Sequence, residues 1–327
     1  MTDSPQTLED SKTVPLEMGQ KRLDQVAASL FSEYSRSRIQ QWIKEGQVLV
    51  NGQVRKPRDK LIGGETLSLK AVLIDEERWE AEPVELNVVY EDEDLIVINK
   101  PAGLVVHPGA GTPGGTLLNG LLYRYPELKS VPRAGIVHRI DKDTTGLMVV
   151  ARNLAAHTSL VNQLQDRTMG REYEALVTGT MTGGGRVNEP IGRHATARTK
   201  MAVTPTGKEA TTHYRVTDRF RNHTFIRCKL ETGRTHQIRV HMAHIGYPLV
   251  GDPVYAGRKR LPKGVTRAVS EALRQFERQA LHAAQLELIH PRTGERMAWQ
   301  ADTPDDMLDL LALLEADHEG EVDEDEL

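Results

Sequence analysis

The chain has 327 residues, which predicts about two domains, and 39% of them are hydrophobic, enough for sizeable cores. Its single cysteine, Cys228, excludes a disulfide framework or a Cys-based zinc site within one chain and fits a reducing compartment. The start is polar and acidic, unlike a secretory signal, and no stretch approaches the ~18 apolar residues of a membrane span. We therefore expect a cytoplasmic protein without a membrane partner.

The net charge of −4 combines two regions of opposite sign. Residues 315–327 contain eight acids and no Lys or Arg, so the net charge of the remaining chain is +4. Residues 17–70 contain ten Lys or Arg against six Asp or Glu. This basic excess is compatible with an anionic polymer as partner, but an ordinary charged surface would also produce it.

Residues 1–16 are polar, acidic and without periodicity, so we expect a disordered tail. A compact unit is expected over residues 17–75, because apolar residues recur at helical spacing in 23–30 and 39–43. In the same unit, "QVLVNGQV" predicts a hairpin with an Asn-Gly turn, and "ETLSLK" predicts a further strand. A linker is expected over residues 76–84.

Strands and helices are interspersed without a strict βαβ period between residues 85 and 314. This pattern predicts an α+β fold with a mixed, mostly antiparallel sheet, followed by an acidic tail over residues 315–327. The expected strands lie in "ELNVVYEDEDLIVINKP" and near residues 146–152, 171–178, 211–217, 224–231 and 283–289. The expected helices lie near residues 116–124, 154–167 and 235–245, with a last helix capped by Thr303 and starting at Pro304.

Three stretches match catalytic motifs only in part. "GAGTPGGT" has Gly115 where a P-loop needs Lys, and a loop that ends in Thr116 as a helix cap explains it better. "HRID" and "LIVINK" lack the Gly-rich loop and the D-F-G of a protein kinase. His236, His241 and His244 crowd one predicted helix, but no acid lies on that helix, so no metal site is predicted.

The stretch "HRIDKDTTGLMVVAR", residues 138–152, places Asp141 between Arg139 and Lys142 in a loop before an apolar strand. Loops held by rigid strands commonly present catalytic groups. Flanking cations keep a carboxylate ionised, which suits a nucleophile or a base. An Asp that only caps a turn explains the stretch equally well, so the residues alone leave both interpretations open.

The same stretch resembles the signature of the RluA-type pseudouridine synthases, HRLD followed two residues later by TSG, with Ile140 and Thr145 as mild changes. "GREYEALVTG", "LETGRTHQIRVHMAHIGYPLVGDPVYA" and "QALHAAQLELIHP" resemble further motifs of that family, so the resemblance covers about residues 80–300. Residues 17–75 resemble the S4 RNA-binding module, a small α/β domain.

The resemblance implies that the chain isomerises uridine to pseudouridine, a reaction that needs no cofactor and no metal. It implies Asp141 as the essential acid and Arg239 as the partner that orients this acid. It also implies that Tyr173 stacks on uracil and takes part in removing the C5 proton, although its ordinary pKa near 10 makes it a poor base. Arg139 is implied to fill the gap that a flipped uridine leaves. Whether Asp141 attacks the sugar, attacks the base or removes a proton stays open.

The resemblance further implies large-subunit ribosomal RNA as the partner, with the loop of its helix 69 as the target, and we expect a monomer. A non-catalytic RNA-binding assembly factor on the same fold, or a synthase for another ribosomal or transfer RNA, remains possible. The expected RNA contacts of the S4-like unit are Arg22, Ser35, Arg36, Arg38, Lys44, Arg55 and Lys56. Those of a loop beside the catalytic residues are Arg193, Arg198 and Lys200.

Overall fold

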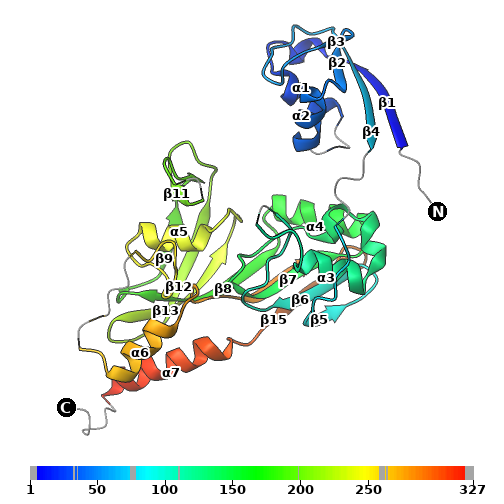
Figure 1. Ribbon diagram of the computed structural model, residues 1–327. Helices are drawn as coiled ribbons and strands as arrows, with labels where there is room; N and C mark the ends of the chain where they lie inside the picture. The colour runs from blue at the N-terminus through cyan, green and yellow to red at the C-terminus, as the bar shows by residue number, and fades with distance from the viewer. Residues whose placement is uncertain are drawn as a thin grey trace. The chain divides into compact units, whose positions relative to one another are not determined.

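The computed structural model divides into two compact units, Met1–Arg78 and Trp79–Leu327 (Figure 1). No helix among the described residues is both long enough and apolar enough to cross a membrane. The structure describes residues 6–31, 34, 36–73, 79–109, 111–197, 199–257, 262 and 264–320.

The N-terminal unit contains two helices that share one buried core with a four-stranded sheet of order β1-β4-β2-β3. The expected hairpin is present: β2 and β3 pair antiparallel, and Asn51 and Gly52 between them have φ of 49° and 77°. These left-handed values are what a two-residue Asn-Gly turn requires. The elements are β1 (Gln6–Thr13), η1 (Leu16–Met18), α1 (Leu23–Leu30), α2 (Arg36–Lys44), β2 (Val48–Val50), β3 (Gln53–Val54) and β4 (Thr66–Leu73).

The first strand differs from the disordered tail that we expected over residues 1–16. Gln6–Thr13 form β1, which pairs antiparallel with β4 along its whole length, from Gln6 opposite Leu73 to Thr13 opposite Thr66. A strand of eight residues such as β4 leaves a row of backbone donors and acceptors along its outer edge. Pairing with that edge requires backbone groups and not apolar side chains, so the polar composition of β1 did not reveal it.

The second unit is built on a nine-stranded sheet of order β5-β6-β7-β14-β8-β13-β12-β9, with β15 paired to β14. Among the described pairings of this sheet only β7 with β14 is parallel, so the mixed, mostly antiparallel sheet is confirmed. Its strands are β5 (Val88–Glu91), β6 (Leu95–Lys100), β7 (Thr145–Ala151), β8 (Gly170–Thr178), β9 (Gly185–Asn188), β12 (Thr211–Arg219), β13 (His223–Leu230), β14 (Leu281–Ile289) and β15 (Arg296–Gln300).

Strand β7 is buried along its whole length, because alternate residues enter two different cores. Met148 and Val150 pack with α3 on one face, whereas Leu147 and Val149 pack with α4 on the other (Figure 1). The other elements are α3 (Leu117–Arg124), η2 (Pro126–Ser130), η3 (Pro132–Gly135), α4 (Leu154–Gln165), β10 (Ile191–Arg193), β11 (Met201–Val203), α5 (Gln237–His244), α6 (Arg267–Gln275) and α7 (Asp305–Glu319). The loop that enters β7 is therefore attached to a rigid element.

Helix caps agree with the sequence at one site and differ at another. Thr116 caps α3 in a capping box with Asn119, as predicted. The cap of α7 is Pro304 and not Thr303, because the Thr303 hydroxyl donates to Glu174 Oε2 at 2.6 Å instead.

The boundary that we expected between residues 314 and 315 falls inside a helix, since α7 continues to Glu319. Asp317 is buried there and accepts a hydrogen bond from the Thr266 amide at 2.8 Å, so it belongs to the fold and not to a solvated tail. Residues 321–327 lie outside the described part of the chain.

Candidate active site

Asp141 lies in the loop that enters β7, with its side chain 17% exposed. The Thr144 amide donates to the Asp141 carbonyl at 3.1 Å and closes this turn. Gly146 follows in β7 with φ of 111°, and a Cβ there would lie 2.3 Å from the Ala283 carbonyl oxygen. Only glycine fits where β7 meets β14 so closely. The loop is thus held by its own turn and by the parallel contact of these two strands.

Arg239 joins two carboxylates from different parts of the chain. It lies in α5, is 4% exposed, and donates from Nη1 to Asp141 Oδ2 at 2.8 Å. Its Nε and Nη2 donate to the two oxygens of Asp252 at 2.7 and 2.9 Å. A bidentate contact of this kind fixes the plane of the guanidinium group. The third nitrogen can then orient Asp141.

Asp252 was not singled out in the sequence, although it lies in the "VGDPVYA" part of a motif that did suggest the family. Its Oδ1 also accepts the amides of Val254 and Tyr255 at 2.8 and 3.0 Å. Burial raises the pKa of Asp252, but the hydrogen bonds and charge of Arg239 outweigh it and leave this pKa below its usual value. Asp252 therefore remains charged beside Arg239, and the pair forms a fixed base for Asp141.

His236 and Tyr255 close one side of this arrangement. His236 Nε2 lies 3.8 Å from Asp141 Oδ1, and its Nδ1 lies 2.7 Å from the Tyr255 hydroxyl. The Arg239 guanidinium carbon lies 5.1 Å from the centre of the Tyr255 ring, within cation–π range. Burial lowers the pKa of His236, while Asp141 opposes this shift. The His236 ring thus faces the carboxylate, in a position that the sequence pattern did not indicate.

Tyr173 shares a small pocket of about 60 Å³ with Asp141, Arg139 and Arg239. It lies on β8 and is 6% exposed. Burial raises the pKa of its phenol; the charge of Arg171 acts against this shift, and that of Asp141 adds to it. The four residues expected to act in catalysis are thus brought together. The surroundings of Tyr173 thus make its phenol a weaker acid, and its ring lines the small pocket beside Asp141.

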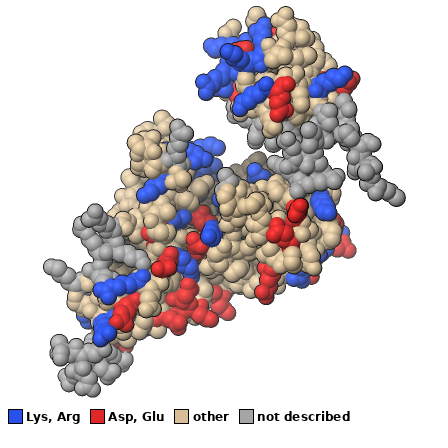
Figure 2. Space-filling model, viewed as in Figure 1, with Lys and Arg blue, Asp and Glu red and all other residues tan. Residues whose placement is uncertain are grey.

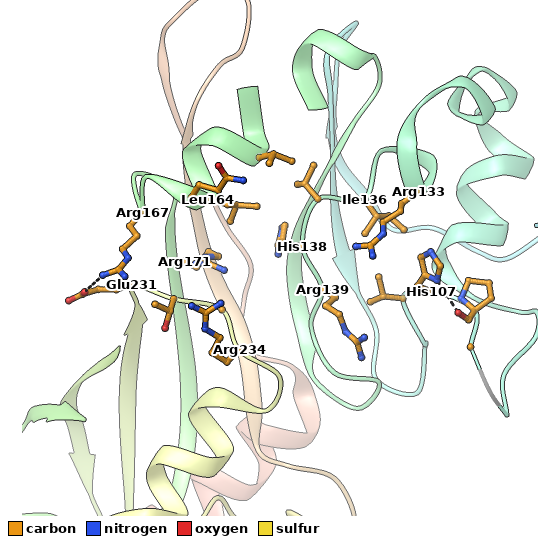
Figure 3. A pocket seen from close by; sticks show the side chains of 18 residues that line it. His107, Arg133, Ile136, His138, Arg139, Leu164, Arg167, Arg171, Glu231 and Arg234 are labelled. Atoms are coloured by element: carbon orange, nitrogen blue, oxygen red, sulfur yellow. Dashed lines mark hydrogen bonds and ion pairs between the residues drawn. The ribbon is translucent and has the colours of Figure 1, made fainter. Parts of the chain in front are cut away.

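A larger pocket of about 800 Å³ adjoins the small one, and Arg139, Arg171 and Arg234 line both (Figure 3). Its one lining acid, Glu231, contacts His213 at 2.5 Å and Arg167 at 3.5 Å. The arginines around this pocket are Arg133, Arg139, Arg167, Arg171 and Arg234. The space beside the candidate catalytic acid is therefore strongly cationic.

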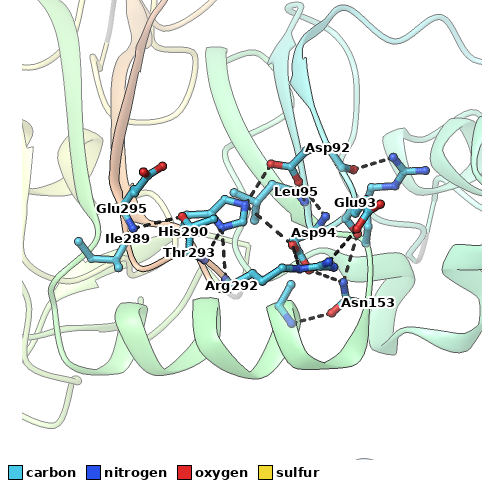
Figure 4. Close-up of polar contacts among 12 residues, drawn as sticks. Asp92, Glu93, Asp94, Leu95, Asn153, Ile289, His290, Arg292, Thr293 and Glu295 are labelled. Atoms are coloured by element: carbon cyan, nitrogen blue, oxygen red, sulfur yellow. Dashed lines mark hydrogen bonds and ion pairs between the residues drawn. The ribbon is translucent and has the colours of Figure 1, made fainter.

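Asp92, Asp94 and His290 form a second polar cluster, with ligand-type atoms within 4.8 Å of one another (Figure 4). Their lone pairs are already used. Asp92 accepts from Tyr90 at 2.6 Å and lies 3.0 Å from His290 Nε2, while Asp94 accepts from Asn153 at 2.8 Å and Arg292 at 3.0 Å. The cluster fastens the β5–β6 turn to the start of α4 and to the β14–β15 turn, so its role is structural.

The residues expected to bind RNA fall into three groups. Lys44, Arg55 and Lys56 are exposed on the N-terminal unit, where Figure 2 shows Lys and Arg gathered, and Arg193 is exposed at the end of β10. Two others also have partners in the chain: Arg22 contacts Asp24 with two nitrogens at 2.9 and 2.8 Å, and Lys200 donates to the Val254 carbonyl at 3.2 Å. The structure does not describe Ser35, Arg198 or the side chains of Arg36 and Arg38.

Comparison with known proteins identifies the family of both units. Residues 94–244 match the family model described as RNA pseudouridylate synthase, and residues 21–67 match the S4 domain. "Ribosomal large subunit pseudouridine synthase D" of Pseudomonas aeruginosa is 59% identical over 309 residues, covering 94% of this chain and 97% of that protein. The protein of the same name from Escherichia coli strain K12 is 58% identical over 309 residues, covering 94% of both chains.

Two solved human structures are also similar. "RNA Pseudouridylate Synthase Domain Containing 1" has a TM-score of 0.54 and 26% identity, covering 71% of this chain and 89% of that one. "RNA Pseudouridylate Synthase Domain Containing 4" has a TM-score of 0.56 and 24% identity, covering 70% and 93%, and supports the fold alone.

Proposed function

Because the chain belongs to the RNA pseudouridylate synthase family, we propose that it converts specific uridines of large-subunit ribosomal RNA to pseudouridine. The names of relatives that are 58 to 59% identical over nearly the whole chain support this target. An S4 domain at residues 21–67 supports an RNA partner. The relatives supply the substrate class, and the site must supply the chemistry.

The observation that carries the proposal is the contact of Arg239 with both Asp141 and Asp252. Pseudouridine formation breaks the bond between C1′ of the ribose and N1 of uracil, turns the base, and joins C1′ to C5. The C5 proton is released and N1 takes up a proton, so the product is an isomer of uridine. Attack by a carboxylate and proton removal by one both need a charged, oriented oxygen. Arg239 compensates the charge of Asp141 and fixes its direction through the 2.8 Å bond. We assign Asp141 as the catalytic carboxylate, which acts in its charged form, and Arg239 as the residue that positions it.

Tyr173 and Arg139 are assigned the handling of the base. The Tyr173 ring lies in the same small pocket as Asp141, where a flipped uracil can stack on it. Arg139 is exposed at the rim that the two pockets share, so its planar guanidinium can occupy the position that the base leaves. Flipping costs least in an RNA loop. Among such loops, the resemblance to the family implies the loop of helix 69, which is the first target to test. We also propose that the protein works as a monomer in the cytoplasm, where ribosomal RNA is assembled into subunits.

The test incubates the purified full-length protein with large-subunit ribosomal RNA, small-subunit ribosomal RNA and transfer RNA, each labelled with tritium at C5 of uridine. Release of tritium reports loss of the C5 proton, and mapping of the product locates the pseudouridine. We expect release from large-subunit RNA alone. Release only from transfer RNA would contradict the target, whereas tight binding of every RNA without release would favour the non-catalytic assembly factor.

A further inference from the structure

Arg171 is a buried arginine without a partner among the described residues. It lies on β8, is 7% exposed, and its Nε is buried without a hydrogen-bond partner. No hydrogen bond or ion pair joins its side chain to any other described residue. Buried charged groups in proteins are as a rule paired, because an isolated charge loses its hydration without compensation. Arg171 therefore has guanidinium donors that are not used by the described residues, in a side chain that lines both pockets.

Arg171 lies where the two pockets meet. It precedes Tyr173 by two residues on β8, and residues two apart on a strand share one face of the sheet. It lines the small pocket together with Asp141 and the large pocket together with Arg139 and Arg234 (Figure 3). Its charge opposes the rise in the pKa of Tyr173, and it contributes, after burial, to lowering the pKa of His138 to about 3. The guanidinium thus lies between the position of the base and the larger cationic space.

Gly233 leaves room for this guanidinium. A Cβ at Gly233 would lie 2.7 Å from Arg171 Nη1, closer than real Cβ contacts allow. Gly233 itself is exposed and lines both pockets. Because it has no side chain, it leaves the adjacent Arg171 guanidinium uncovered at the pocket wall. A larger residue at position 233 would displace the Arg171 guanidinium without removing its positive charge.

The described carboxylates that line the two pockets with Arg171 already have cationic partners. Glu231 is occupied by His213 and Arg167, and Asp141 is held by Arg239. The remaining charged residues that line the large pocket are arginines. A phosphodiester offers the acceptor geometry that a guanidinium fork binds best, and an RNA strand brings one with every nucleotide.

We propose that Arg171 binds the RNA phosphodiester that adjoins the flipped uridine, and so holds the backbone while the base enters the small pocket. This inference rests on the proposed function, since it needs an RNA nucleotide at Asp141. Arg139 and Arg234 lie around the same space and widen the cationic wall. The ion pair forms only when RNA is present, which ties substrate binding to satisfaction of a buried charge.

The test removes the charge of one RNA phosphate and the charge of Arg171, separately and together. Stem-loop RNA carries one neutral methylphosphonate linkage, placed 5′ of the target uridine, 3′ of it, or in the distant stem. Each RNA is bound to the full-length wild type, to Arg171→Met, and to Arg267→Met, which removes an exposed arginine of α6 as a control. We expect one of the two flanking linkages to weaken wild-type binding about tenfold or more, the effect of one charge-assisted contact. Arg171→Met should weaken binding of unmodified RNA equally, and the two changes together should cost no more than either alone.

Additive losses, or no loss for Arg171→Met, would overturn the assignment. The stem linkage should affect all three proteins alike. Inorganic phosphate that raises the melting temperature of the wild type, without coupling between Arg171 and any RNA linkage, would assign the site to free phosphate and also overturn it. If the wild type binds with this coupling but converts no uridine, the proposed function fails while the phosphate contact stands.

Two further measurements separate binding from folding. Met fills a similar volume and removes an uncompensated buried charge, so Arg171→Met should melt at or above the wild-type temperature. A lower melting temperature would indicate a structural arginine. Gly233→Ala keeps the charge and moves the guanidinium, so it should show a reduced, phosphate-specific loss at the same linkage. Equal effects of all linkages in Gly233→Ala would contradict the contact.

Discussion

Two buried arginines of the catalytic unit, Arg239 and Arg171, have opposite surroundings. Arg239 meets two carboxylates of its own chain, whereas Arg171 meets no charged partner among the described residues. Both line the small pocket that contains Asp141. The two arginines therefore have different roles in one site. Arg239 is paired before the substrate binds and orients Asp141, whereas Arg171 remains available for a negative charge of the substrate.

The first way to break this comparison is to remove the acid that Arg239 holds. Asp141→Asn keeps the size of the side chain and an oxygen for Arg239, but an amide is neither a nucleophile nor a base. We expect turnover to fall by about 10³-fold or more, while the affinity for RNA changes little. Single-turnover tritium release and a binding titration on the same RNA check this. Activity near the wild-type level would remove Asp141 from the mechanism.

The second compares the two arginines directly. Arg239→Met leaves Asp252 buried and unpaired, which should lower the free energy of unfolding by about 3–5 kcal/mol. It also releases Asp141, so turnover should fall by about 10²-fold or more. Arg171→Met should not lower the free energy of unfolding. Urea denaturation of the two variants at one pH measures the two free energies of unfolding. A similar loss in each variant would contradict the proposed difference between the two arginines.

The third concerns Tyr173, whose ring lines the same small pocket as the two arginines. Tyr173→Phe keeps the stacking surface and removes the phenol, so RNA should still bind while loss of the C5 proton slows by about 10²-fold. The pKa of Tyr173 is raised, so a phenolate base would make the wild-type rate rise with pH above neutrality, and the Phe variant would lack this rise. Tritium release over a range of pH checks this. Unchanged release in the variant at every pH would show that Tyr173 only packs.

The smallest expected effect concerns Arg139, the exposed cation at the shared rim. Filling the gap of a flipped base offsets unstacking of a few kcal/mol in a structured loop and little in an unstacked strand. Arg139→Ala should therefore lose about tenfold on a stem-loop and less on an unstructured oligomer of the same sequence. Arg139→Lys, which keeps the charge without the planar fork, should restore only part of the rate. Equal losses on both RNAs would leave Arg139 as an electrostatic neighbour of Asp141.

The sequence indicated residues that act through a motif, and it missed those that act through a contact. Asp141, Tyr173 and Arg239 lie in stretches long enough to be recognised, and strands and helices interspersed without a strict βαβ period indicated a mixed, mostly antiparallel sheet. Asp252 was missed because its role depends on a bent loop that brings it to Arg239. Arg171 was missed because its lack of a partner among the described residues is a property of the folded pocket. A sequence motif does not indicate such a property.

Backbone pairing explains the other differences. The strand β1 was missed because most of its side chains are polar, whereas its backbone pairs with β4 along its whole length. The end of α7 was placed too early because Asp317 was counted with an acidic tail, although the fold buries it against Thr266.

The most direct test of the central claim, that Asp141 held by Arg239 converts uridine in large-subunit ribosomal RNA, is a pseudouridine map of that RNA in cells. The gene is deleted and replaced by the wild type or by Asp141→Asn at equal protein levels. The account predicts that a discrete set of pseudouridines disappears on deletion, returns with the wild type and stays absent with Asp141→Asn. An unchanged map after deletion, or full restoration by Asp141→Asn, would contradict it.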